Sequence, residues 1–87
     1  EAATLWSNRS GRTLKVFTTQ PGLQVYTGNW LEGCPEGKRG RKWHDYSAVA
    51  LECQHFPDSP NKPSYPSTEL KPGKTFHEAI IYSFGVK

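Results

Sequence analysis

The sequence LECQHFPDSPNKPSYPST, from Leu51 to Thr68, joins two kinds of backbone and decides the fold class. Its first residues continue an apolar run that begins at Ala48, and short runs of this kind are typical of a β-strand. The rest is rich in proline, which fixes φ and removes a hydrogen-bond donor, and therefore predicts a stiff loop. Glu52 lies inside the strand-like run. A carboxylate among apolar side chains loses hydration, so it needs a partner or a chemical task.

Short alternating runs separated by turn residues recur along the whole chain. We expect strands at residues 3–7, 12–19, 23–27, 48–55 and 75–84. A turn cluster at residues 8–11 predicts a hairpin between the first two strands. No window supports an amphipathic helix of normal length, so the sequence predicts an all-β chain. The last run has apolar residues on both faces, which is typical of a central strand in a larger sheet.

This set of strands is too small to cover itself. A chain of 87 residues buries a small core, and five strands joined by long loops leave exposed edges and an open face. We therefore expect residues 1–87 to form part of a large antiparallel β-sandwich, with no internal domain boundary. No long apolar run predicts a membrane span.

The alternation of side chains gives Glu52 a specific setting. In a strand, residues two apart lie on the same face. The face that carries Glu52 also carries Ala48, Ala50 and Gln54, whereas Gln24 and Tyr26 share a face on the preceding strand. Small alanines leave room above the carboxylate, either for a ligand or for a closely packed neighbouring strand.

Two blocks of the chain resemble one enzyme family. The block at residues 51–68 resembles the carboxyl-terminal signature of aldose 1-epimerases, the galactose mutarotases. A second block, TTQPGLQVYTGNWLEG at residues 18–33, is similar to an upstream block of that family, and the order and separation also fit. The resemblance implies the carboxyl-terminal segment of a galactose mutarotase-like supersandwich. It also implies a cofactor-free isomerase, with Glu52 as the catalytic general base and Gln24 as a substrate-binding residue.

The resemblance covers only the last part of the family's length. The general-acid histidine of the family lies in the missing portion, and His44, His55 and His77 do not match it. We therefore expect the isolated chain to be inactive, and to associate with itself or with the missing segment. The resemblance further implies an aldose such as galactose or glucose as substrate, a monomeric parent protein and a cytoplasmic location. The alternative is a non-catalytic carbohydrate-binding module of the same superfamily.

The net charge of +3 includes one basic cluster within the glycine-containing loop at residues 31–45. Its members are Lys38, Arg39, Arg41 and Lys42. A phosphate or nucleic-acid patch is one interpretation, and a solvated loop is the other. We favour the solvated loop and expect no nucleic-acid partner, because no repeated basic stripe or base-stacking platform accompanies the cluster.

The remaining reactive side chains predict structural roles. Cys34 falls in a turn and Cys53 within a strand, so we expect no disulfide between them. No metal site is expected, because histidines and cysteines lack the short spacing of zinc ligands. Asp58 is close enough to Glu52 in sequence to suggest a glycosidase pair, although a turn-forming role is favoured. Stacking on sugars by Trp30 and Trp43 is the minor alternative to a packing role.

Overall fold

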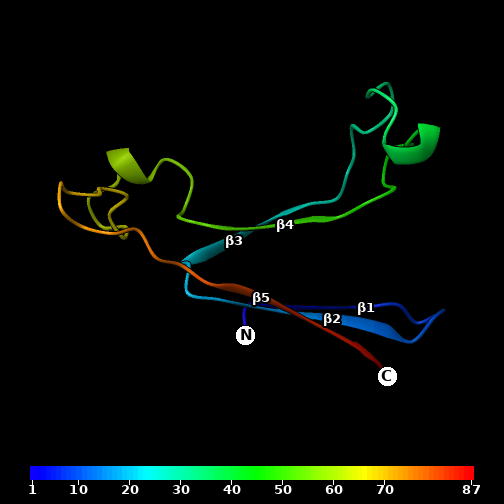
Figure 1. Cartoon of the computed structure of the whole chain (residues 1–87), viewed down its shortest axis with the longest axis horizontal. Coiled ribbons are helices and arrows are strands. Elements are labelled where there is room, and N and C mark those ends of the chain that lie inside the picture. The colour runs from blue at the N-terminus through cyan, green and yellow to red at the C-terminus, as the bar shows by residue number, and fades with distance from the viewer.

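A computed structural model describes all of residues 1–87 and contains five strands and no α-helix. The strands are β1 (Ala3–Trp6), β2 (Arg12–Thr18), β3 (Gly22–Tyr26), β4 (Ala50–Gln54) and β5 (Ile80–Val86). Two single turns of 3-10 helix, η1 (Lys38–Gly40) and η2 (Ser59–Asn61), lie in the loops. The strands form two antiparallel sheets, one in the order β1-β2-β5 and one of β3 and β4 (Figure 1). The all-β class and the number of strands are as the sequence predicts.

The predicted hairpin at the start of the chain is present. β1 pairs with β2 from Ala3 opposite Val16 to Trp6 opposite Thr13. The turn closes through Gly11, whose amide donates to the Ser7 carbonyl over 2.8 Å. Gly11 has φ of +69°, a left-handed conformation that glycine adopts without steric cost. The local turn residues therefore set the register of the first two strands.

The last strand differs from its predicted bounds and position. Pairing with β2 begins at Thr18 opposite Ile80 and ends at Arg12 opposite Val86. Residues 75–79 lie past the end of β2 and are not part of β5, although the Thr19 amide still donates to the Ala79 carbonyl over 3.1 Å. Within these 87 residues β5 is an edge strand and all seven of its residues are exposed, so a central place in a larger sheet stays a prediction.

The two sheets bury very little between them. Val16 is the one fully buried hydrophobic side chain, and the accessible surface is 7399 Å². A compact protein of 9.8 kDa would expose roughly 5,200 Å². The radius of gyration is 16.7 Å, against roughly 12 Å for a compact domain of this length. The strands are thus arranged as part of a sandwich, with apolar faces that the 87 residues leave uncovered.

The β3–β4 ribbon carries the long loops of the molecule. Figure 1 shows the connection that contains η1 extending from one end of the ribbon, and the proline-rich segment that contains η2 extending from the other. The ribbon lies in its own layer beside the β1-β2-β5 sheet. Both stretches of sequence that carry the candidate site residues therefore belong to one two-stranded element. None of the chain's helical turns is long and apolar enough to cross a membrane.

Candidate functional site

Gln24 and Glu52 lie directly opposite each other in the β3–β4 ribbon. The register runs from Gly22 opposite Gln54 to Tyr26 opposite Ala50, so the pair occupies the central position of the ladder. Residues directly opposite in an antiparallel pair point to the same face, with Cβ atoms about 4.5–5.5 Å apart. The two residues that the sequence singled out for different reasons are therefore neighbours, and their amide and carboxylate extend from one surface.

The face around this pair carries polar residues together with a glycine and an alanine. Strand alternation places Gly22, Tyr26, Ala50 and Gln54 on it together with the central pair. The prediction that Ala50 and Gln54 share the face of Glu52 agrees with the register, whereas Ala48 lies before β4 begins. An amide two positions away from a carboxylate adds donors that a hydroxyl-rich ligand would use.

Glu52 is not desolvated by this chain. Its side chain is exposed, and it takes part in none of the four ion pairs of the molecule. The apolar residues that flank Glu52 in the sequence, Leu51 and Cys53, alternate to the opposite face of the ribbon and are only half-buried. The expectation that neighbours in the strand would remove water from Glu52 is therefore wrong for these 87 residues, and only a further covering element could do so.

The turn after β3 is built tightly. Gly28 is buried, has φ of +69°, and accepts a 2.7 Å hydrogen bond from the Tyr46 amide. A Cβ at this position would lie 2.7 Å from the Ala48 carbonyl oxygen, so no side chain fits. The Tyr26 hydroxyl accepts a hydrogen bond from the Trp30 amide over 3.1 Å. These contacts fix the end of the ribbon nearest Tyr26.

The other end of the ribbon is packed by an aromatic residue that the sequence argument did not select. The Phe56 ring lies over Gly22, where a Cβ would be 2.8 Å from its Cδ1 atom. Phe56 also packs edge-to-face against Tyr65, with ring centroids 5.2 Å apart. Strand alternation could have indicated this contact, because Phe56 follows Glu52 and Gln54 at intervals of two residues and would share their face.

Asp58 has a local structural role. It adopts a left-handed conformation with φ of +63° at the start of η2. Its Oδ1 accepts a 2.6 Å hydrogen bond from the Asn61 side-chain amide, and its Oδ2 lies 3.8 Å from the Lys62 Nζ. The predicted role as a turn former agrees with this geometry, and a carboxylate engaged in these contacts is not presented as the partner of Glu52 in a glycosidase pair.

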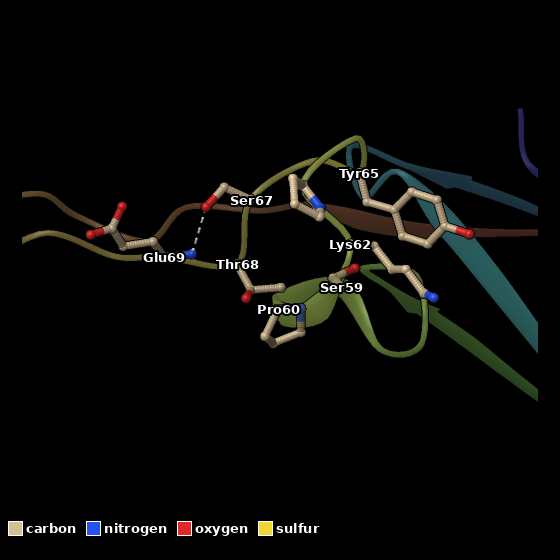
Figure 2. A pocket seen from close by; sticks show the side chains of 8 residues that line it. Ser59, Pro60, Lys62, Tyr65, Ser67, Thr68 and Glu69 are labelled. Carbon is tan, nitrogen blue, oxygen red and sulfur yellow. Dashed lines mark hydrogen bonds between the residues drawn. The ribbon is translucent and has the colours of Figure 1, made fainter.

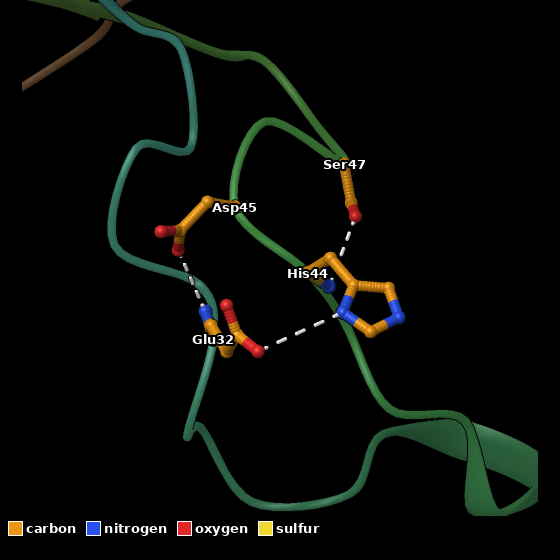
Figure 3. A network of polar contacts seen from close by, with 4 residues as sticks. All are labelled: Glu32, His44, Asp45 and Ser47. Atoms are coloured by element: carbon orange, nitrogen blue, oxygen red, sulfur yellow. Dashed lines mark hydrogen bonds and ion pairs between the residues drawn. The ribbon is translucent and has the colours of Figure 1, made fainter.

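The long basic loop forms a polar network of its own, separate from the ribbon face (Figure 3). The Glu32 amide donates to Asp45 Oδ1 over 2.9 Å, and the Glu32 carboxylate lies 4.0 Å from His44 Nδ1. The His44 amide donates to the Ser47 hydroxyl over 3.1 Å. His44 is thus part of a loop closure.

The basic cluster in that loop is exposed, as a solvated loop requires. Lys42 lies 3.9 Å from a Glu36 carboxylate oxygen, so part of its charge is balanced locally. Cys34 and Cys53 are both free thiols in this structure, Cys34 exposed and Cys53 half-buried. No group of three or more histidine, cysteine, aspartate or glutamate side chains converges as metal ligands would.

Hollows of the surface lie both in the loops and along the β1-β2-β5 sheet. One of about 340 Å³ lies within the proline-rich segment and is drawn in Figure 2. It is lined mainly by hydroxyl-bearing and charged side chains: Ser59, Lys62, Tyr65, Ser67, Thr68 and Glu69. Another of about 360 Å³ lies beside Trp43 and His44 in the basic loop. Neither hollow is lined by Gln24 or Glu52, whose ribbon face is open.

Comparison with known proteins gives this geometry a context. The family model described as aldose 1-epimerase matches residues 1–83. The chain belongs to the aldose 1-epimerase family. It is 46% identical over 77 residues to the galactose mutarotase of Mus musculus and 44% identical to that of Homo sapiens, in both cases over 88% of the chain. It is 42% identical over 86 residues to the aldose 1-epimerase of Escherichia coli strain K12, over 95% of the chain.

These matches cover a small part of the relatives. The chain spans 22% of the length of the two mammalian proteins and 24% of the length of the bacterial one. The family model match nevertheless includes both blocks that carry Gln24 and Glu52. The uncovered sheet faces of the chain fit a segment of a larger β-structure.

Proposed function

We propose that this chain is the carboxyl-terminal segment of an aldose 1-epimerase and supplies the general base of the reaction. The proposal rests on one observation above all. Glu52, the carboxylate in the family-like block, lies directly opposite Gln24 on an open face of the β3–β4 ribbon. A base beside an amide is an arrangement suited to a sugar hydroxyl, since the amide can donate to one oxygen while the carboxylate accepts a proton from another.

The proposed reaction is a pair of proton transfers. The Glu52 carboxylate takes the proton of the C1 hydroxyl, the C1–O electron pair forms the aldehyde, and the bond from C1 to the ring oxygen breaks. An acid outside these residues protonates the ring oxygen as that bond breaks. After the C1 end rotates, the same transfers run in reverse on the other face of the aldehyde and give the opposite anomer. No redox change or cofactor is needed.

Gln24 would hold the sugar while Glu52 works. A Gln side chain offers two donors and one acceptor, which match the hydroxyls of a pyranose. Gln24 lies directly opposite Glu52 on the neighbouring strand, so the two side chains are close in space although distant in sequence. We propose galactose or glucose as substrate, from the names of the relatives and the resemblance, and a cytoplasmic location for the parent protein as a part of the same proposal.

The acid must come from elsewhere in a longer protein. His44 is held in the basic loop, His77 lies outside all strands, and His55 alternates to the face opposite Glu52. The proposal therefore includes an incomplete site in the isolated chain. Polarimetry of the full-length protein with α-galactose and α-glucose tests it, and catalysed relaxation of optical rotation above the buffer rate is the expected result.

A second candidate function is a non-catalytic carbohydrate-binding module. The open polar face of the ribbon would serve such a module equally well, because Gln24, Gln54 and Glu52 are hydrogen-bonding groups. The same experiment separates the two functions. A full-length protein that binds galactose but leaves the rate of mutarotation at the buffer value would support the binding module and contradict the isomerase.

A further inference from the structure

Phe56 lies on the same face of the ribbon as Gln24 and Glu52. Gly22 and Gln24 are two residues apart in β3, so a side chain at Gly22 would point to the same face as Gln24. A Cβ on Gly22 would lie 2.8 Å from Cδ1 and 2.9 Å from Cε1 of the Phe56 ring. The ring therefore occupies the space that a side chain at residue 22 would fill, next to the Gln24–Glu52 pair on the same face.

The ring is held from two sides. Tyr65 packs against it edge-to-face, at an interplanar angle of 72°. The Phe56 carbonyl accepts hydrogen bonds from the Ser59 amide over 3.2 Å and the Ser59 hydroxyl over 2.5 Å. Ser59 is 6% exposed, which makes it the one buried polar side chain of the molecule. The backbone at Phe56 is thus fixed by a sheltered turn, and the ring orientation by an aromatic neighbour.

Part of the Phe56 ring remains free. The residue is 37% exposed although Gly22 and Tyr65 contact its ring. Two residues along a strand span about 6.8 Å, so the ring lies roughly one pyranose width from the Gln24–Glu52 pair. An aromatic face carries partial negative charge and attracts the polarised C–H groups of a sugar ring, in addition to its apolar contact.

We propose that Phe56 is a substrate-binding wall of the epimerase site, against which the C–H face of the pyranose packs while C1 lies at Glu52. This rests on the proposed function and adds a residue to it. Tyr26, one position along on the other side of the pair, already uses its hydroxyl to accept the Trp30 amide and closes the turn. Phe56 has no polar tip to engage, and its free surface is available to a ligand.

Such a wall binds the sugar equally in the ground state and the transition state. Its removal should therefore raise KM and leave kcat nearly unchanged. A leucine retains the apolar contact with Gly22 but lacks the aromatic face. Phe56→Leu thereby separates a residue that only packs the loop from one that contacts the sugar, since the packing role survives the change and the stacking role does not.

The test is steady-state polarimetry on the full-length protein with four variants. Phe56→Leu should raise KM about 3- to 10-fold with kcat within about twofold of wild type, and Phe56→Tyr should restore the wild-type KM. Phe76→Leu removes an exposed aromatic ring outside the ribbon and is the matched control, with no expected change in KM. Gly22→Ala leaves the ring intact but pushes it from its place, and should raise KM as Phe56→Leu does.

Each result decides the inference. A wild-type KM in both Phe56→Leu and Gly22→Ala, in an active protein, would overturn the role of Phe56 and leave the proposed function standing. If Phe56→Leu does not fold, Gly22→Ala still decides, because Gly22 has no positive φ and the ring is the side chain that its new methyl group meets. A wild-type protein without mutarotase activity would overturn both proposals together.

Discussion

Gln24 in β3 and Glu52 in β4 face each other across one rung of an antiparallel ladder, although 27 residues of loop and strand separate them in the sequence. The connection between them is mostly loop, and the hydrogen bond from the Tyr46 amide to the Gly28 carbonyl closes its base. The pairing makes the two side chains a single candidate site. Loss of each side chain should nevertheless have its own kinetic effect, because one is proposed to move a proton and the other to bind the sugar.

Replacement of Glu52 by glutamine should abolish most mutarotation in the full-length protein. The amide cannot accept the C1 proton, and loss of a general base costs about 10²–10⁴ in rate. The fold should survive, because Glu52 is exposed and makes no ion pair in these residues. Polarimetry with α-galactose measures the effect. Glu36→Gln, which alters an exposed pair with Lys42, is the control and should behave as wild type. A Glu52→Gln rate within a few-fold of wild type would remove Glu52 from the mechanism.

Replacement of Gln24 by alanine should weaken sugar recognition and leave the base in place. The lost amide contacts are expected to cost roughly 1–3 kcal/mol in kcat/KM, the usual penalty when a polar partner is left unmatched. Gln20→Ala, at the bend between β2 and β3, is a matched amide deletion off the ribbon face. Unchanged kcat, KM and affinity in Gln24→Ala would return Gln24 to a structural role in the sheet.

The turn at Gly28 should be far less tolerant of a side chain than the loop at Gly33. Both residues have positive φ, at +69° and +84°, so alanine carries the same backbone penalty at each. A Cβ at Gly28 would lie 2.7 Å from the Ala48 carbonyl oxygen, whereas none would be within 4 Å at Gly33. Gly28→Ala should cost roughly 1–3 kcal/mol more, because its methyl group overpacks the turn.

Urea unfolding of the full-length protein would measure both glycine variants. Equal unfolding midpoints for Gly28→Ala and Gly33→Ala would show that the turn relaxes around the new methyl group. Gly28 would then have no part in holding the Gln24–Glu52 register.

Local signals in the sequence predicted what local interactions determine. The hairpin through Gly11, the alternation that groups Glu52 with Ala50 and Gln54, and the turn role of Asp58 all depend on residues close in sequence. The register of β3 against β4 depends on residues far apart in the sequence. No pattern in either strand predicted that Gln24 would lie opposite Glu52.

The failures of the sequence argument have a physical cause as well. The start of β5 depends on where β2 stops, because Thr18 lies opposite Ile80. The apolar run at residues 75–84 does not indicate where that pairing begins. The exposure of Glu52 depends on what covers the ribbon face, and alternation fixes only which residues share that face. The Phe56–Gly22 contact was missed because both residues lie beside a proline, Gly22 after Pro21 and Phe56 before Pro57. Glycine and residues next to proline are typical of turns.

The isolated 87-residue chain should be catalytically silent and should self-associate. It contains the proposed base without a matching acid, and its accessible surface of 7399 Å² is far above that of a compact protein of this mass. The edge strand β5, IIYSFGV, has no charge and no proline, which are the usual protections of an exposed edge. Light scattering should therefore report a mass above 9.8 kDa, and polarimetry should report the buffer rate.

A charge placed on that edge should reduce the association. Ile81→Lys introduces a lysine near the start of β5, where pairing with a second edge would bury it. Ser67→Lys adds the same charge in the exposed proline-rich loop and is the matched control, with no expected change in mass. If the unmodified chain proved to be a well-folded, active monomer, the acid would have to be sought among His44, His55 and His77, and the proposal that the site is completed by another segment would be wrong.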